Sequence, residues 1–333
     1  MGSKRERQRF FATVAGAAIT IFTGGLGAGF SAALAGVTFT KVALATAASY
    51  ALNALNPQQK QAGNASGGYG VGVNAVLPNA PRQVIYGRPR VGGAVFYQNV
   101  LPDNVTLYQC IAFADHEITS YDEIYLNEEK IDPNTIDTGI IPNYNTAFLL
   151  ISPDGTSRNI FGATSYQERL GTLDQSFASM PSNTQWTEEH KAAGVAYLTV
   201  RHYYDANRKD FPNGVPAISA LISGKKVYDP RTGETAFTDS SDIEIGRNPA
   251  LILRDYLIYS GIATTAEIDE DAFSTAANIC DENVTLSGGS TEKRYRCDGA
   301  YLTQENPQDI IKSIIATMGG MIWYSNGKWS CKA

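Results

Sequence analysis

The N-terminal part of this chain contains a long run without charge. Residues 10 to 40 carry no charged side chain, and after Lys41 the apolar sequence resumes and continues to Leu55. This run is longer than the ~20 apolar residues with which a helix crosses the hydrocarbon core of a membrane. We therefore expect a long apolar segment, helical in form, over residues 1–56. Its large apolar side chains, which are candidates for contact with lipid or with the inside of an assembly, are Phe10, Phe11, Val14, Ile19, Ile21, Phe22, Leu26, Phe30, Leu34, Val37, Phe39, Val42 and Leu44.

Three interpretations of this segment stay open. Basic residues at 4–9 and an Ala-x-Ala site at 43–45 are typical of a secretory signal peptide, although the run is longer than a normal signal core. The run could instead form a transmembrane hairpin whose spans meet near residues 36–41, with its glycines allowing close helix packing. Alternatively, the segment is buried among symmetry-related copies of itself until it is released.

Behind the apolar segment the composition is that of a folded protein. Of the 333 residues, 18% are charged and 43% are hydrophobic, which is not the balance of a disordered chain. Residues 57–74 are rich in Gly, Asn, Gln and Ser, a composition typical of a flexible linker. We place a β-rich domain at 75–235 and an α+β module at 236–333. The predicted fold class is therefore α+β, with β-structure predominating.

Short apolar and aromatic runs predict the strands of the first domain. They include the runs at 83–87, 94–97, 106–114, 123–126, 196–203 and 217–227. Residues 133–190 are polar and show weak periodicity. We expect them to form an insertion that projects from the β-rich domain.

Cap signals predict the helices of the second module. Asn-Pro pairs at 248–249 and 306–307 each supply a capping side chain followed by proline at the first helical position. Thr264 and Glu267 form a capping box that is expected to open a further helix. The last helix is expected to stop at the glycine pair 319–320.

A β-hairpin is expected at residues 321–329. Asn326-Gly327 is the sequence that a two-residue type I′ turn favours. The chain ends at Ala333, which leaves a short second strand. We expect that further protein follows in nature.

The sequence contains no recognised catalytic motif. The HExxH, GxSxG and Walker patterns are absent. His116 lies among acidic residues and is interpreted as part of a solvated loop face, whereas His190 and His202 have no nucleophile partner at a suitable spacing. The acidic residues 269–271 fit the first turn of a helix. We predict that the chain is not an enzyme and holds no cofactor or metal.

Cysteine spacing and net charge exclude further classes of function. Cys110, Cys280, Cys297 and Cys331 lie far apart without a CxxC pair, so neither zinc nor redox chemistry is indicated. Cys280 and Cys297 are interpreted as buried free thiols, with a disulfide between them as the alternative. The formal net charge of −6 argues against tight binding of nucleic acid. It would suit a surface past which DNA slides without sticking.

Three stretches together carry a resemblance to a known family. The first is PRQVIYGRPRVGG at 81–93, the second comprises FPNGVP at 211–216 and GKKVYDPRTG at 224–233, and the third begins with RNPALILRDYL at 247–257. Ala277-x-x-Cys280-Asp281 and RYRC at 294–297 follow in order. Over about residues 75 to 333 the set resembles the tail-tip hub proteins of long-tailed (siphovirus) bacteriophages, the J-type host-specificity family. The motif residues are Tyr86, Gly87, Arg88, Arg90, Gly92, Gly93, Asp229, Pro230, Arg231, Asn248 and Pro249.

The resemblance implies a homotrimeric baseplate hub. Its β-barrel-like domains would form a pseudo-sixfold ring between the tail tube and a central fibre, in the virion, after assembly in the cytoplasm of the host bacterium. Its partners would be the distal tail protein, other tail-tip and tail-tube proteins, and DNA that passes without specific binding. The apolar segment would plug the tip or insert into the host membrane. The family is normally much longer, so receptor binding, which belongs to its later regions, is not assigned here.

Two rival functions stay open at this point. A membrane-anchored bacterial envelope protein with a soluble β-domain would explain the apolar segment. A cell-wall hydrolase would use carboxylates of the acidic region from Asp115 to Glu129.

Overall fold

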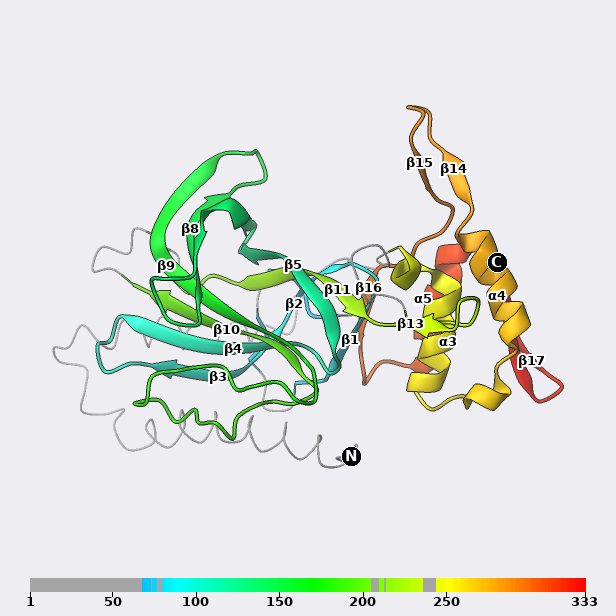
Figure 1. The fold of residues 1–333 in the computed structure, drawn as a ribbon, viewed down its shortest axis with the longest axis horizontal. Coiled ribbons are helices and arrows are strands. Elements are labelled where there is room, and N and C mark those ends of the chain that lie inside the picture. The colour runs from blue at the N-terminus through cyan, green and yellow to red at the C-terminus, as the bar shows by residue number, and fades with distance from the viewer. Residues whose placement is uncertain (1–67, 73, 77–79, 205–209, 213, 236–243) are drawn as a thin grey trace.

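The computed structural model describes residues 68–72, 74–76, 80–204, 210–212, 214–235 and 244–333. The apolar segment 1–56, with every candidate side chain named in it, and most of the linker 57–74 lie outside these ranges. None of the helices found within them has the length and hydropathy of a membrane span. The described residues form a barrel-like sheet beside a helical module (Figure 1).

One large sheet forms the β-rich part, as the sequence predicts. Its strands are β2 (Arg90–Gly92), β3 (Ala94–Val100), β4 (Thr106–Ala114), β5 (Ile118–Leu126), β6 (Glu129–Ile131), β8 (Asn145–Ile151), β9 (Ser157–Leu170), β10 (Ala196–Tyr203) and β11 (Ile218–Lys225). They are arranged in the order β2-β11-β5-β6-β8-β9-β10-β4-β3, and β7 (Ile136–Asp137) pairs with β8. Every pairing between these strands is antiparallel.

The two ends of this sheet meet, so that it is nearly closed. Its first and last strands, β2 and β3, are consecutive in the chain and are separated by Gly93 alone. A side chain at Gly93 would place its Cβ 2.6 Å from the carbonyl oxygen of Ala112, so the close approach requires glycine. The preceding segment covers the edge: Ala75 bridges Ala94, and the Gly92 N–H donates to the carbonyl of Tyr69 at 3.0 Å. Covered edges of this kind resist unwanted pairing with other chains.

Strand β4 is covered on both faces, and for this reason polar and apolar residues alternate only weakly in its sequence. All nine of its residues are buried. Ile111 and Phe113 face the core inside the sheet, whereas Cys110 and Ala112 face a second cluster that contains Trp186. A strand covered on both faces has no polar face for the pattern to reveal.

Residues 133–190 contain two long strands that weak periodicity did not indicate. β8 and the 14-residue β9 belong to the large sheet, and their far ends project from it (Figure 1). The segment also contains the short helix η1 (Pro133–Thr135). Polar residues on the inner face hide the strand pattern, since Thr164 is buried and its hydroxyl hydrogen-bonds to Nδ1 of buried His202 at 3.0 Å.

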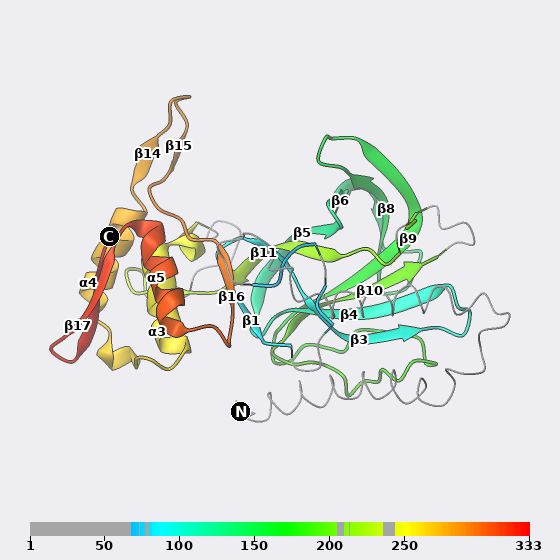
Figure 2. The ribbon, with the colours of Figure 1, turned by 180° about the vertical axis from the view of Figure 1, so that it is seen from behind.

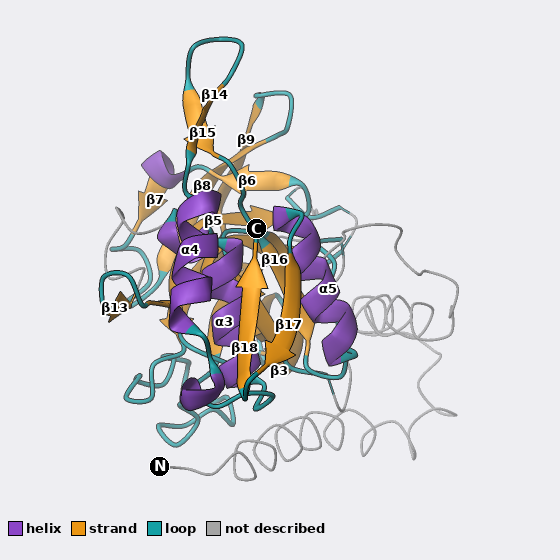
Figure 3. Cartoon of the chain, turned by 90° about the vertical axis from the view of Figure 1, so that its right-hand side faces the viewer, coloured by secondary structure: helices purple, strands orange, loops and turns teal. Residues whose placement is uncertain are grey.

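The helical module is built around one buried helix. α3 (Pro249–Tyr259) packs against α4 (Glu270–Cys280) and α5 (Pro307–Met318), and β18 (Lys328–Lys332) lies along α4 beside β17 (Met321–Ser325) (Figure 3). The remaining elements are β12 (Tyr228–Asp229), β13 (Glu234–Thr235), η3 (Ile245–Arg247), η4 (Thr265–Glu267), β14 (Asn283–Thr285), β15 (Thr291–Lys293) and β16 (Gly299–Leu302). The position of the domain boundary near residues 235–236 stays a prediction, because residues 236–243 are not described.

The cap signals are confirmed for α3 and α5 and need correction for α4. Asn248 and Asn306 accept hydrogen bonds from the first turns of their helices, and α5 ends at Gly319 in the left-handed conformation. The box formed by Thr264 and Glu267 lies at the start of the short helix η4 and does not open α4. α4 begins after Asp269, whose side chain is its cap.

Candidate functional site: the junction between sheet and helical module

A two-stranded ribbon connects the two parts of the molecule. β1 (Gln83–Tyr86) pairs antiparallel with β16, from Gln83 opposite Leu302 to Tyr86 opposite Gly299. The ribbon lies between the large sheet and the helices in both views of the fold (Figures 1 and 2). The first family-like stretch, 81–93, therefore begins inside the molecule and ends at the closure of the sheet.

The ribbon is shared by two hydrophobic cores. All four residues of β1 are buried. Val84 and Tyr86 belong to the core of the helical module, whereas Ile85 belongs to the core of the sheet. In β16, Tyr301 belongs to the core of the helical module and Ala300 to the core of the sheet. Because side chains alternate along a strand, one short ribbon seals both cores.

Tyr86 hydrogen-bonds to an ion pair inside this junction, formed by Lys225 and Asp255. Its hydroxyl donates to Oδ2 of Asp255 on α3 at 2.5 Å, while Nζ of Lys225 at the end of β11 donates to Oδ1 of Asp255 at 2.8 Å. The Tyr86 ring stacks on Tyr301 with centroids 6.2 Å apart. Burial and the neighbouring Asp255 carboxylate raise the pKa of Tyr86 well above its ordinary value. A neutral hydroxyl at this position links the sheet, the ribbon and the helix.

Gly87 and Asp298 bring the first and third stretches together. Gly87 has φ +66°, and a Cβ on it would lie 2.2 Å from the backbone oxygen of Cys297. Oδ1 of Asp298 accepts the backbone N–H of Arg88 at 2.8 Å. The guanidinium of Arg247 donates to both carboxylate oxygens of Asp298, at 2.8 and 2.5 Å. The glycine thus permits an approach that the carboxylate then fixes.

Arg88 and Arg90, which follow Gly87, attach the other side of this turn to the large sheet. Arg88 pairs with Asp122 of β5 at 2.5 Å. Arg90 lies over the ring of Tyr125, 3.8 Å from its centroid, and pairs with Glu128 at 3.0 Å. At Gly92 a Cβ would lie 2.1 Å from the carbonyl oxygen of Gly70, so no side chain fits where the covering segment passes.

The second stretch is fastened to α4 through Arg231. Its guanidinium donates to both oxygens of buried Asp229, at 2.9 to 3.1 Å, and pairs with Asp281 at 2.7 Å. Pro230 lies between Asp229 and Arg231, in the turn that connects β12 to β13. The Asp-Pro-Arg motif is thereby a structural clamp between this turn and the end of α4.

Asn248 connects two helices. Its side-chain oxygen caps α3 by accepting the N–H of Ala250 at 3.1 Å, and its amide donates to the carbonyl of Ala277 in α4 at 3.0 Å. Pro249 takes the first helical position, where a missing N–H costs nothing. The third stretch therefore packs α3 against α4.

The acidic residues between Asp115 and Glu129 pair with basic residues. Each of six carboxylates has a Lys or Arg partner, in the pairs Arg82–Asp115, Lys226–Glu117, Arg88–Asp122, Lys130–Glu123, Arg90–Glu128 and Arg158–Glu129. At Glu129, the hydrogen bonds from the Arg158 guanidinium hold the pKa of the carboxyl below its ordinary value.

His116 is buried, so its interpretation as part of a solvated loop face was wrong. Its Nε2 accepts the backbone N–H of Ile85 at 3.0 Å, and its Nδ1 lies 2.7 Å from the carbonyl oxygen of Glu117. Burial lowers the pKa of His116 to about 4, which keeps the ring neutral for this bridging role. The acidic neighbours in the sequence concealed a histidine that holds β1 in place.

His202, Glu168 and the four cysteines are also titratable, and burial determines their state. Burial lowers the pKa of His202 to about 3 and raises that of Glu168 to about 7. All four cysteines are buried free thiols, in agreement with the interpretation of Cys280 and Cys297. Within the described residues, no group of three or more His, Cys, Asp or Glu side chains is arranged to hold a metal ion.

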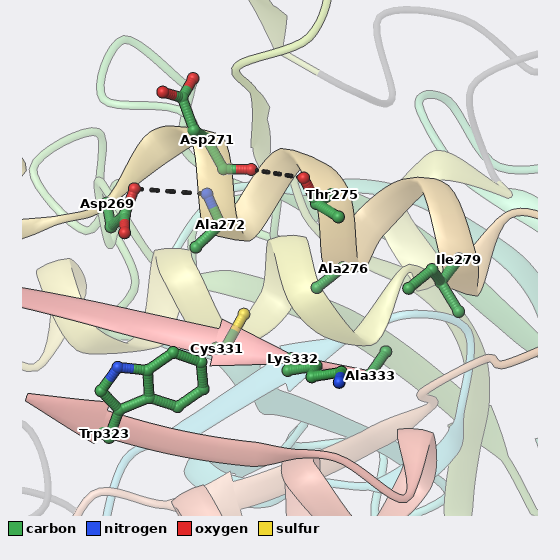
Figure 4. A pocket seen from close by; sticks show the side chains of 10 residues that line it. All are labelled: Asp269, Asp271, Ala272, Thr275, Ala276, Ile279, Trp323, Cys331, Lys332 and Ala333. Atoms are coloured by element: carbon green, nitrogen blue, oxygen red, sulfur yellow. Dashed lines mark hydrogen bonds between the residues drawn. The ribbon is translucent and has the colours of Figure 1, made fainter.

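A pocket lies between α4 and the β17–β18 hairpin. Small residues of α4, such as Ala272 and Ala276, form one wall and Trp323 lies across from them (Figure 4). Two polar side chains of this wall bond to the backbone of the helix: Asp269 accepts the N–H of Ala272 at 3.3 Å, and Thr275 donates to the carbonyl of Asp271 at 2.8 Å.

The structure thus brings motif residues of all three stretches to one junction and its immediate supports. Sequence reasoning missed the acidic partners Asp255, Asp298 and Asp281, and it missed Lys225. Asp255, Asp281 and Lys225 lie within the family-like stretches, but charge alone does not reveal which residue a carboxylate will meet across the fold.

Comparisons with known proteins add little to this geometry. No protein-family model matches the chain, and no curated protein matches it. Among solved structures, the chain is similar to a chain described as "Virion of native gene transfer agent (GTA) particle", with a TM-score of 0.38 and 12% identity over 78% of this chain. The match spans 65% of the length of that chain. A likeness at this level carries no argument about function.

Proposed function

We propose that this chain is a structural component of a phage tail tip. In this proposal it forms a homotrimeric baseplate hub that joins the tail tube to a central fibre and lines part of the DNA ejection conduit. Its partners are further copies of itself, the distal tail protein, and other tail-tip and tail-tube proteins. Its apolar N-terminal segment plugs the tip or inserts into the host envelope.

The observation that carries the proposal is the resemblance of the three stretches to tail-tip hub proteins. Their convergence on the ribbon junction supports it, because residues that build one structural unit have reason to occur together. Gly87, Asp229 and Asn248 come from three separate stretches: Gly87 permits a close approach, and the side chains of Asp229 and Asn248 fasten neighbouring elements of that unit.

We also propose that the chain performs no covalent chemistry. The ion-paired carboxylates from Asp115 to Glu129 and the neutral, buried His116 and His202 support this. Zymography on peptidoglycan tests the hydrolase alternative, and we expect no clearing. A net charge of −6 suits a conduit for DNA, since like charge prevents the polymer from adhering.

The central experiment asks where the chain resides and in how many copies. Tail particles should be purified from cells that produce this protein, and the tip symmetry determined by electron cryomicroscopy. We expect threefold density at the tip. A monomer that fractionates with bacterial membranes would overturn the hub and favour the second candidate, a membrane-anchored envelope protein, which the uncharged run at 10–40 also suits.

The role of the apolar segment has its own test. Deleting residues 10–55 should leave particles that assemble but eject DNA into cells poorly. Normal ejection by the deletion particles would contradict envelope insertion without affecting the hub proposal.

A further inference from the structure

The outer edge of β17 is free to pair with another strand. In a hairpin with a two-residue turn the flanking residues, Ser325 and Lys328, form a hydrogen-bonded pair, and such pairs then recur at every second position. Ile322 and Tyr324 of β17 therefore direct their backbone N–H and C=O groups away from β18. The same rule directs Trp329 of β18 outward, and its carbonyl indeed accepts the N–H of Asp269 at 2.9 Å. In the described part of the chain β17 pairs with β18 alone.

This edge lacks the features that usually prevent association. β17 reads MIWYS, without charge, proline or bulge. Met321 and Tyr324 are 60% and 54% exposed, and Trp323 is also exposed. By contrast, Tyr69 and Ala75 cover the ends of the large sheet, and Asp269 covers β18. Uncharged, aromatic edge strands left open are sites of strand addition.

The β14–β15 hairpin is a strand pair in need of a partner. It projects from the helical module, and none of its residues is buried (Figure 1). An isolated two-stranded hairpin is marginally stable in water. Leu286 donates to Ser290 and Arg294 donates to Glu282, so hydrogen-bonded pairs alternate and Asn283 and Thr285 direct their backbone groups outward.

The outer edge of this hairpin matches that of β17 in character. β14 reads NVT and is uncharged, while the charges of the hairpin, Glu292 and Lys293, lie on β15. Val284 and Leu286 expose apolar side chains beside it. Joining β14 to β17 therefore opposes no like charges and covers apolar surface on both sides.

We propose that β14 of one copy of this chain pairs antiparallel with β17 of a second copy. Asn283 then lies opposite Tyr324, and Thr285 opposite Ile322, so that all four outward residues find partners. A contact within one copy is excluded by position, because the β14–β15 hairpin projects from one side of the module and the β17–β18 turn lies on the opposite side (Figures 1 and 3).

The contact joins two different surfaces, so each copy has one of each to offer. A heterologous contact of this kind propagates from copy to copy and closes into a ring when the rotation allows. The inference rests on the proposed function in one respect, namely that the ring has three members. It supplies the contact through which the helical modules of a trimeric hub would hold one another.

Cysteine cross-linking of the full-length protein tests the pairing. Asn283→Cys and Tyr324→Cys are introduced singly and together, and the four native thiols are buried. Residues in a hydrogen-bonded antiparallel pair have Cα atoms about 5.5 Å apart, within the range of a disulfide. We expect the mixed single variants to form a heterodimer under mild oxidation and the double variant to form covalent higher oligomers. Thr291→Cys, on the other edge of the same hairpin, is the matched control and should give no product with Tyr324→Cys.

Proline variants provide a second measurement. The outward N–H of Thr285 is not used within the hairpin, so Thr285→Pro removes an edge donor while sparing the internal ladder. Thr291→Pro is the equivalent change on the other edge. We expect Thr285→Pro to weaken self-association about tenfold, as measured by sedimentation, and Thr291→Pro to leave it unchanged. Circular dichroism verifies that both variants fold.

Each other outcome overturns either the strand pairing or the hub proposal on which it rests. Self-cross-linking of Tyr324→Cys alone would mean that β17 pairs with β17 of another copy. Equal yields with Asn283→Cys and Thr291→Cys would mean random collision, and no product at all would mean a different occupant. If cross-links fail although tail particles contain three copies, the strand pairing is wrong and the hub stands. If cross-links form but no particle contains the chain, the hub is wrong.

Discussion

The β1–β16 and β14–β15 ribbons are alike in form and opposite in surroundings. Each consists of two short antiparallel strands outside the large sheet. β1 is buried along its whole length between two cores, whereas β14 is exposed along its whole length. β14 hydrogen-bonds to its partner strand as β1 does, so backbone pairing alone does not distinguish them. Stability in a ribbon comes from what covers its faces.

The largest expected difference between the ribbons appears when one apolar side chain of each is shortened. Ile85→Ala removes buried methyl groups from the sheet core, and we expect the free energy of unfolding to fall by about 4 kcal/mol. Val284→Ala, on the exposed ribbon, should change it by less than about 0.5 kcal/mol in the unassembled chain. Urea denaturation measures both. Equal effects would show that burial does not distinguish the ribbons.

The contact between His116 and β1 should make the stability of the buried ribbon depend on pH, whereas the exposed ribbon has no such contact. The pKa of His116 is about 4 in the fold, whereas an unfolded histidine titrates near its ordinary value of about 6.5. Between these values the unfolded chain binds the additional proton, so this contribution to stability is complete above pH 6.5 and is lost as the pH falls toward 4. The full loss amounts to about 3 kcal/mol.

A variant separates this contribution from those of other groups. His116→Gln should be more destabilised relative to the parent at pH 7 than at pH 4, by about 3 kcal/mol. Because His202 and Glu168 are present in both proteins, their titrations cancel in the comparison. His190→Gln, which replaces a half-buried ring stacked on Trp186, is the matched histidine substitution for comparison. A constant difference across the pH range would contradict the role of His116.

A smaller effect is expected from the ion pair that fastens the ribbon to α3. Asp255→Asn removes the charge that Tyr86 and Lys225 share, and we expect a loss of about 2 kcal/mol. Asp309→Asn breaks an exposed pair with Lys312 at 3.5 Å and should change stability by less than about 0.5 kcal/mol. Thermal unfolding of the two variants in parallel gives the comparison, and similar melting temperatures would argue against a buried clamp.

The smallest expected effect concerns the third ribbon, β17–β18. Gly327 has φ +77° with open space around its Cα, so Gly327→Ala meets conformational strain but no clash. We expect a loss of about 1 kcal/mol. Gly288→Ala, in the β14–β15 turn, has no positive φ and should be nearly neutral. Hydrogen exchange of the two hairpins would locate each effect.

Local signals predicted the elements whose stability is set within a few residues. The Asn306-Pro307 cap and Gly319 bound α5, and Asn326-Gly327 forms the turn of β17–β18 with positive φ at both positions. The barrel-like expectation, which came from family resemblance, is confirmed by the nearly closed sheet. Residues 145–170 were missed as strands because their buried faces include polar side chains that find partners across the sheet, as Thr146 does with Ser165.

The sequence by itself determined where α3 and α5 begin, where α5 stops and where the β17–β18 hairpin turns, because these depend on the conformational preferences of neighbouring residues. The tertiary structure alone decided that Gln83 pairs with Leu302, that His116 is a buried bridge and that Asp255 meets Tyr86 and Lys225. Such contacts join residues far apart in the chain. Their partners are chosen by the packing of whole elements, which no local pattern of charge or hydropathy encodes.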